Sequence, residues 1–341
     1  MFASESMTLT TRLTIYSALT ALLLLTGTAT MAQKRSEVLR GRLDSLLDKK
    51  YNKVNYDTTY IGRPDAILTL KARTSVSGND MRIRQDVEGV RVKADLETSH
   101  MVNFSLSANY KGLAAGISLN PAKLKGRNND FEFNLNYYSN RFSVDASYQM
   151  SKTMAGDVYN GDNAFHIGRG MLKTRVLNVA GYYVFNYKRF SFPAAFTQTY
   201  IQKRSAGSWL LGFSYQGGSL KATDEAPDAM PALRFYVGHF GIGGGYGYNW
   251  VLHRKWLLHL SALHTLVVGD YNNVTIDGEK RKVHGKFPEL ILNERAAVVY
   301  NMGAKKFAGL SFNMSNFILG HGHDRTSQTK WIARAFFGLR L

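Results

Sequence analysis

The sequence predicts an all-β fold: a single antiparallel transmembrane β-barrel of about 12 strands with a short N-terminal periplasmic helix. From residue 66 to the end, apolar and polar side chains alternate with a period of two, the pattern of strands with one apolar face. The polar face is mainly Asn, Ser, Gln and Gly, and the apolar face carries Tyr and Trp near strand ends. This favours a lipid-facing wall around a polar interior over a soluble sandwich, whose outer face would be rich in Lys and Glu.

The first 32 residues have the pattern of a secretory signal peptide. Arg12 is followed by the mostly apolar run Leu13–Leu25, and small residues lead to Ala32. A single membrane anchor is the alternative, but the apolar run is short for a membrane-spanning helix. We therefore expect cleavage after Ala32, export, and insertion of the mature chain into the outer membrane of a Gram-negative envelope.

Residues 33–64 are expected to form a periplasmic helix and an approach segment, which precede a barrel at residues 65–341. Apolar residues at helical spacing predict the helix within Arg35–Lys50. They are Val38, Leu39, Leu43, Leu46 and Leu47. The polar, tyrosine-rich stretch that follows ends where the period changes to two.

Twelve strand-like segments follow, and their connections fall into two length classes. The segments are residues 66–73, 102–110, 113–119, 131–137, 142–149, 176–187, 208–216, 240–250, 256–268, 290–300, 307–314 and 331–341. The short connections are Lys111–Gly112, Ser139–Arg141, Leu252–Lys255 and Gly303–Lys306. The long ones are residues 78–89, 121–130, 151–173, 219–233, 269–288 and 317–329. Outer-membrane barrels have an even strand number, short periplasmic turns and long external loops, which this alternation matches.

The stretch Lys188–Gly207 decides the topology. It resembles one more strand, but Pro193 cannot donate a hydrogen bond to a central ladder. If it spanned the membrane, short and long connections would no longer alternate between the two sides. We therefore assign it as a periplasmic inturn, able to fold into the lumen. Its candidate plugging or gating residues are Phe190, Pro193, Phe196, Gln202, Lys203 and Arg204.

The polar face of the predicted strands should point into the lumen. These residues are Asn103, Glu132, Asn134, Asp145, Gln149, Ser214, Gln216, Asn293, Arg295, Arg334 and Arg340. Their mixed carboxylates and guanidinium groups are compatible with a lined pore and with an interior locked by ion pairs. Twelve strands lie between filled eight-strand barrels and open sixteen-strand porins, so barrel width does not decide between the two.

The sequence excludes several kinds of site and contains no motif for several others. The absence of Cys rules out disulfides, thiolate metal sites and a lipoprotein anchor. The net charge of +18 is scattered, without a nucleic-acid fingerprint, so we expect no nucleic-acid partner. The glycine-rich run Gly241–Gly247 lacks the GxGxxG spacing and is better explained by another segment packing close to the wall. The cluster His321–Asp324 has the character of a solvated loop. We assign no catalytic residue, metal or cofactor.

The last strand alternates up to the final residue, with Trp331, Phe337 and Leu341 on its apolar face. This resembles the C-terminal signal that the outer-membrane insertion machinery reads, although many such signals end in an aromatic residue. The expected partners are that machinery, outer-membrane lipid and lipopolysaccharide, and we expect a monomer.

Four stretches together resemble an uncharacterised domain-of-unknown-function family of outer-membrane β-barrel proteins from Bacteroidetes. They are YDTTYI at Tyr56–Ile61, the run Ser118–Phe142, the inturn and following strand within Phe190–Gly212, and GYGYNW at Gly245–Trp250. The resemblance covers most of the mature chain. It implies location and fold, and it implies no catalytic residues.

The leading functional expectation is a passive pore or small-solute conduit. A structural or envelope-interaction barrel with a closed lumen is the first alternative. The second is an outer-membrane enzyme acting on lipid or glycan, for which His321, His323 and Ser327 are the tempting but weakly supported residues.

Overall fold

The computed structural model describes residues 53–87, 90–110, 113–124, 130–226, 233–276, 278–282, 289–321 and 324–341, with the single residues 41 and 45. The predicted signal peptide lies outside them. Within the predicted helix only residues 41 and 45 are described, and both are helical. In these described parts, no helix is long and apolar enough to cross a membrane.

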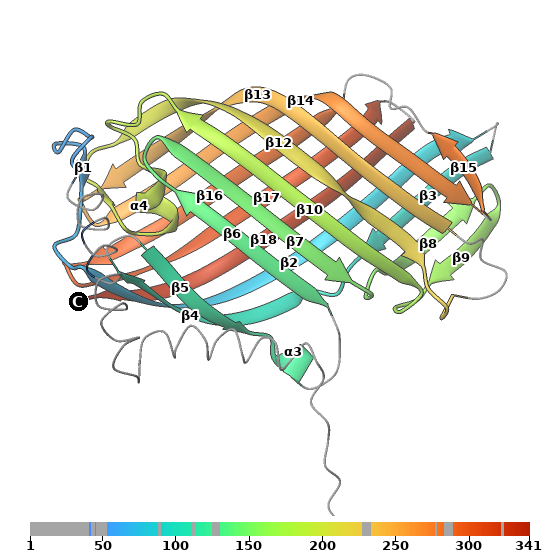
Figure 1. Cartoon of the computed structure of the whole chain (residues 1–341), viewed down its shortest axis with the longest axis horizontal. Helices are drawn as coiled ribbons and strands as arrows, with labels where there is room; N and C mark the ends of the chain where they lie inside the picture. The colour runs from blue at the N-terminus through green and yellow to red at the C-terminus, as the bar shows by residue number, and fades with distance from the viewer. Residues whose placement is uncertain are drawn as a thin grey trace, which may run out of the picture.

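The wall of the molecule is one strongly curled antiparallel sheet (Figure 1). Within the described residues, twelve strands build it, in the order β5 (Leu113–Leu119), β4 (Met101–Tyr110), β2 (Leu68–Val87), β18 (Asp324–Arg340), β17 (Lys306–His321), β16 (Leu290–Met302), β14 (Trp256–Ile276), β13 (Leu233–Leu252), β12 (Ala206–Ala222), β10 (Leu172–Val184), β7 (Phe142–Ser151) and β6 (Phe131–Tyr138). The last strand pairs with the first from Arg340–Thr69 to Arg325–Arg84. The fold is therefore the predicted twelve-strand transmembrane β-barrel.

The backbone ladder is interrupted at one seam. Among the described residues β5 pairs only with β4, and β6 pairs only with β7, so β5 and β6 are the two edges of the curled sheet. These are the shortest wall strands, with 7 and 8 residues, fewer than the 9–11 that a tilted transmembrane strand uses. The short helix α3 (Pro121–Leu124) follows β5.

Several predicted long loops are strands in the structure, which corrects their boundaries. β2 continues to Val87, β14 to Ile276 and β17 to His321. Further strands extend the sheet at this end: β3 (Val90–Glu97), β8 (Ala155–Asn160), β9 (Asn163–Ile167) and β15 (Glu279–Lys282). Beyond the lipid layer no face needs to be apolar, so the alternation fades while the backbone ladder continues.

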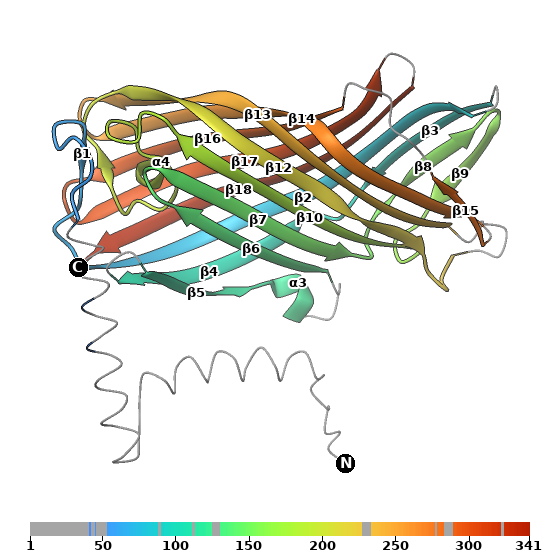
Figure 2. The same ribbon diagram turned by 45° about the horizontal axis from the view of Figure 1, so that its top comes forward.

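The two ends of the barrel differ. The end that carries the turns at residues 139–141, 253–255 and 303–305 is called the short-turn end and lies at the left of Figure 1. The opposite, long-loop end carries β3, β8, β9 and β15 (Figure 2). At the short-turn end, outward aromatic side chains pair across strands, with ring centroids 4.4 Å apart for Trp256 and Tyr300 and 5.2 Å apart for Trp209 and Tyr246. Such a belt marks a membrane interface.

Outer and inner faces carry opposite chemistry. Outward apolar side chains remain open to the surroundings, as in Trp209 at 69% and Leu310 at 60% exposure. Inward positions are mostly polar and buried, including Ser214, Gln216 and Thr265. Two apolar clusters interrupt this polar interior, and both lie around the segment between β10 and β12.

Candidate functional site: the inturn and the charged interior

The inturn Lys188–Gly207 forms a short helix, α4 (Phe192–Phe196), that lies within the short-turn end of the sheet (Figure 1). Ser191 caps the helix in an extended conformation, and its side-chain oxygen accepts a hydrogen bond from the Ala194 amide. Pro193 sits in the first turn, where its missing N–H has no intrahelical partner to lose. The residue that argues against a strand is therefore well suited to start this helix. The inturn ends slightly earlier than predicted, because β12 begins at Ala206.

Apolar side chains seat the inturn against the wall. Phe190 and Phe192 are fully buried and belong to a cluster with Tyr182, Leu210 and Leu263. Ala194 and Ala195 pack in a second cluster against other strands. A Cβ atom placed on Gly247 would lie 3.0 Å from Phe190 Cζ. The glycine-rich strand thus leaves the room that the phenylalanine ring occupies, which is the close packing that the sequence suggested.

Buried hydrogen bonds fix the same segment. The Asn249 side-chain amide of β13 donates to Ser191 O at 3.0 Å and to Gln202 Oε1 at 2.9 Å. His259 of β14 pairs through Nδ1 with Asn249 Oδ1 at 2.7 Å, and the Ser191 hydroxyl donates to Asn140 Oδ1 at 2.7 Å. All five residues are buried. Because unpaired polar groups in such a place are costly, this network specifies one seating of the inturn.

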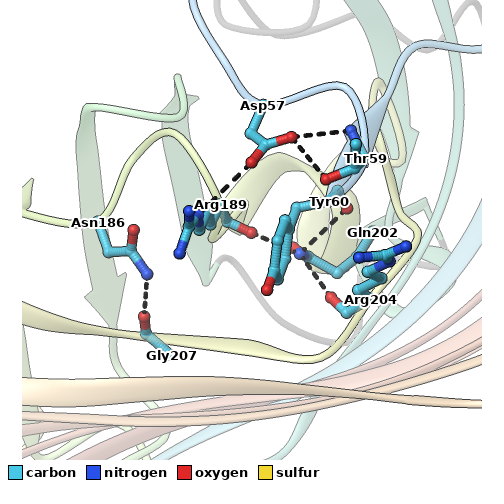
Figure 3. A network of polar contacts seen from close by, with 8 residues as sticks. All are labelled: Asp57, Thr59, Tyr60, Asn186, Arg189, Gln202, Arg204 and Gly207. Carbon is cyan, nitrogen blue, oxygen red and sulfur yellow. Dashed lines mark hydrogen bonds and ion pairs between the residues drawn. The ribbon is translucent and has the colours of Figure 1, made fainter.

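The approach segment lies against the inturn (Figure 3). Strand β1 (Ile61–Gly62) pairs with β11 (Ile201–Gln202). The Gln202 side-chain amide donates to the carbonyl oxygens of Tyr60 at 3.3 Å, Arg189 at 2.6 Å and Arg204 at 2.9 Å. The guanidinium groups of Arg189 and Arg204 lie 5.1 and 5.8 Å from the Tyr60 ring centroid. The predicted plug residue Gln202 therefore joins both ends of the inturn to the approach segment.

Asp57 adds a charged contact to this cover. Its carboxylate accepts hydrogen bonds from the Thr59 amide at 2.9 Å and the Thr59 hydroxyl at 2.6 Å, and it lies 3.5 Å from Arg189 Nε. The hydrogen bonds from Thr59, followed by the charge of Arg189, lower the pKa of Asp57 below its ordinary value. Lys203 also contacts this segment, donating from Nζ to Thr58 O at 3.0 Å, while Arg204 stays exposed.

Farther into the lumen, Arg295 of β16 contacts Asp145 of β7 and the Tyr182 hydroxyl of β10. Tyr138 of β6 donates to the other Asp145 oxygen. The guanidinium is 4% exposed and lies 4.0 Å from the Tyr182 ring centroid. β16 and β7 are separated by four strands in the sheet, so this contact crosses the lumen.

A second set of contacts joins the edge strand β6 and its neighbour β7 to β2 and β18. Lys330 Nζ of β18 lies 2.8 Å from Glu132 Oε1 of β6 and donates to Gln149 Oε1 of β7 at 2.6 Å. Ser77 of β2 donates to Glu132 Oε2 at 2.6 Å. These side chains bridge β6 to β2 and β18, on the inner side of the seam where β5 and β6 share no ladder.

The alternation along each strand and its pairing with its neighbours put every predicted lumen residue on the inner face of the sheet. Gln149, Ser214, Gln216, Asn293 and Arg340 are buried there. Asn293 donates to Ser214 Oγ at 2.7 Å, and Gln216 donates to Gln328 Oε1 at 3.3 Å. Arg340 Nη2 donates to Asn301 Oδ1 at 3.1 Å at the short-turn end. Asn103 is half-buried on β4, and Asn134 and Arg334 border an interior cavity.

Sequence reasoning missed the partners that complete these contacts. They are Tyr138, Tyr182, Asn249, His259 and Lys330. Tyr138 and Lys330 continue the period-two series that contains Asn134 and Arg334, so a strict count along each strand finds them. On β14, His259 is buried and His264 is exposed, so the two histidines occupy opposite faces of the strand.

The histidine-containing cluster at the long-loop end lies largely outside the described side chains, since residues 322 and 323 are not described. In the part of the chain that is described, no group of three or more His, Asp or Glu residues is arranged to hold a metal ion. Ser327 lies in β18 and pairs with Ile318 and Arg82 in the ladder.

A family of proteins matches the chain over residues 55–340, and its description is domain of unknown function (DUF4421). The chain belongs to the DUF4421 family. The match includes the approach segment, the inturn and all twelve wall strands. No curated protein matches this DUF4421 chain.

Solved structures resemble it at low identity. The outer membrane protease OmpT from Escherichia coli is 7% identical, with a TM-score of 0.43, 85% of this chain and 100% of that chain being covered. The outer membrane protein OprG from Pseudomonas aeruginosa is 10% identical, with a TM-score of 0.26 and coverage of 82% and 97%. A mutant of the TodX monoaromatic hydrocarbon channel is 11% identical, with a TM-score of 0.25 and coverage of 82% and 91%. These likenesses carry no argument about activity.

Proposed function

We propose that this DUF4421 protein is an outer-membrane barrel with a closed lumen, which acts through its surfaces rather than as a passive pore. Its short-turn end faces the periplasm in this proposal. The observation that supports it is the double obstruction of the interior. The helix α4 and its buried phenylalanines fill the short-turn end, and above them the Arg295–Asp145 contact crosses from one wall to another.

The space between these contacts is small. One interior cavity, bordered by Arg295, Lys330 and Arg334, has a volume of about 60 Å³. A buried water needs about 10–15 Å³ of such space, so the cavity has room for a few waters. Porins instead keep an aqueous channel through sixteen or more strands. The closed alternative therefore fits the geometry better than the small-solute conduit.

Planar bilayer conductance tests the closure. The wild-type barrel should show no channel steps at any applied voltage. A variant in which Phe190–Thr199 is replaced by a glycine-serine linker, combined with R295A and D145A, should conduct. Each change alone should conduct less, because the other obstruction remains. The control K305A alters an exposed turn residue and should stay closed. Conductance by the wild-type barrel would overturn the proposal.

The surface that supports an envelope role is the short-turn face. Its connections carry exposed basic residues and few acids. They are Arg141, Lys188, Arg189, Lys203, Arg204, Arg254, Lys255, Lys305 and Lys306. The aromatic belt of Trp209, Trp256 and Tyr300 lies beside these connections, so we expect the charges to lie at headgroup height. In this proposal the face binds anionic phospholipid headgroups of the inner leaflet.

Lipid retention tests the surface. The barrel is purified from bilayers that contain equal phosphatidylglycerol and phosphatidylcholine, and its bound lipid is identified by mass spectrometry. The wild type should retain phosphatidylglycerol preferentially. The variant R254Q/K255Q/K305Q/K306Q should lose most of that preference. The control K93Q/K221Q removes exposed charges at the opposite end and should keep it. An unchanged preference in the first variant would contradict the lipid role of this face.

A further inference from the structure

The cavity inside the barrel has an unbalanced charge. It is bordered by three cations, Arg295, Lys330 and Arg334, and by one carboxylate, Asp145. The rest of its polar border consists mainly of amides and hydroxyls. They are Asn134, Asn136, Ser147, Asn178, Asn293, Asn313 and Ser315.

Two of the three cations have partners of their own. Arg295 contacts Asp145, and Lys330 lies 2.8 Å from Glu132. Among the described residues, Arg334 has no carboxylate oxygen within 4.0 Å and no hydrogen bond. Arg73 lies one inward position along β2 from Ser75, the ladder partner of Arg334, and likewise has no ion pair among the described residues. In the described part of the chain, Arg334 and Arg73 therefore lack the carboxylate partners that Arg295 and Lys330 have.

Three residues that border the cavity each have a buried side-chain atom without a hydrogen-bond partner: one donor, on Arg295, and two acceptors, on Asn178 and Asn313. Arg295 is 4% exposed, yet its Nη1 has no hydrogen-bond partner. Asn178 and Asn313 each leave a side-chain amide oxygen unpaired, and rotation of the amide by 180° presents the NH₂ group instead. Arg334 is half-buried, and a cation that is partly removed from water without a counter-charge is unfavourable, so a bound anion would stabilise this arrangement.

We propose that this cavity binds a small inorganic anion between Arg334 and Arg295, with the asparagine amides completing its coordination. A halide and a compact oxyanion such as phosphate share the required chemistry, namely one compact negative charge with several acceptor directions. The anion offsets the charge of Arg334 and joins β18 to β16 and β10. This inference does not depend on whether the lumen conducts, because it rests on the cavity and its charges alone.

Unfolding in urea tests the site. The full refolded barrel is measured in gluconate, chloride, bromide and phosphate at constant ionic strength. Because only the folded state has the cavity, the unfolding equilibrium constant should fall tenfold for each tenfold rise of the bound anion above its dissociation constant. Bromide dependence without phosphate dependence identifies a halide site, and the reverse identifies an oxyanion site. No dependence on any of these anions would overturn the proposal.

Variants separate the site from a general salt effect. R334Q should abolish the anion dependence. R334K keeps the charge and should keep part of the dependence, and it can be measured even if R334Q does not fold. The control R325Q removes an exposed charge on the same strand and should behave as the wild type. Crystals grown with bromide should show anomalous density beside Arg334 and Arg295. An equal anion response in R334Q, or an empty cavity in those crystals, would refute the site. The anion dependence of unfolding is expected whether the barrel conducts ions or not, so this test is independent of the closed-lumen proposal.

Discussion

Replacing Arg295 with Met removes the cation that joins β16 to β7 and β10 inside the barrel. The substitution keeps side-chain volume but deletes the contacts to Asp145 and to the Tyr182 hydroxyl. It leaves Asp145, whose side chain is 17% exposed, with the Tyr138 hydroxyl as its remaining hydrogen-bond donor there. The variant thus leaves the Asp145 carboxylate in the low-dielectric interior without its cationic partner.

The expected cost follows from the burial of both partners. Breaking a buried ion pair from one side costs about 3–5 kcal/mol, because the desolvation penalty of the remaining charge is no longer offset. R295M should therefore lose about 3–5 kcal/mol of unfolding free energy. The double variant R295M/D145N removes both charges, and replacement of a whole buried pair is often close to neutral. We expect it to lie within about 1 kcal/mol of the wild type.

Urea unfolding of the refolded barrel in lipid vesicles, followed by tryptophan fluorescence, measures all four corners of this cycle. D145N alone leaves Arg295 buried without its counter-charge and should be destabilised as much as R295M. These losses imply a coupling energy of at least about 5 kcal/mol, above the 0.5–3 kcal/mol that is usual for residues in contact. If the double variant loses the sum of the two single losses, the pair does not act as a unit and the crossing contact does not lock the interior.

Three further predictions address the inturn, the approach segment and the topology. G247V places side-chain atoms against Phe190 Cζ and Ser261 Cβ, and such overpacking should lower the free energy of unfolding in urea by about 1–3 kcal/mol. Adding F190A should recover part of this loss. An unchanged unfolding free energy in G247V would refute the packing. Because the folded pKa of Asp57 lies below its ordinary value near 3.9, its stabilisation of the approach segment is complete above about pH 3.9 and is lost as pH falls through the lowered pKa. The protection factor of the Lys203 amide against hydrogen exchange should fall at acidic pH in the wild type and be low at all pH values in D57N, because this amide donates to Tyr60 O at 2.7 Å. An epitope inserted within residues 283–288 should be reached by antibody on intact cells and one within residues 303–305 should not; the opposite result inverts the orientation.

The strand number followed from the sequence because connection length and residue period are local properties. Pro193 excluded the inturn from the wall, and the alternation of short and long connections then required twelve strands. The glycines before Trp250 indicated a close neighbour, and Phe190 is that neighbour at Gly247. The strand extensions to Val87 and Ile276 escaped prediction because a ladder in water leaves no apolar alternation.

The partners inside the lumen did not follow from the sequence, and the reason is geometric. Register within a hairpin is set by nearby residues, but Arg295 meets Asp145 across a distance of 150 positions. That meeting depends on barrel curvature, which no strand encodes by itself. The seam between β5 and β6 adds to this, since Lys330 and Glu132 come together there without an intervening ladder.

An inward polar face is therefore poor evidence for a pore. Asn, Ser, Asp and Arg line open channels and locked interiors with the same period of two, and only the reach of the side chains distinguishes the cases. In this barrel the long inward side chains of Arg295 and Lys330 reach partners on strands that are not their neighbours in the sheet, Tyr182 and Gln149 respectively. Shortening them removes the obstruction without changing the alternation. The combined variant of α4 and Arg295 thus separates the two interpretations where the sequence pattern cannot.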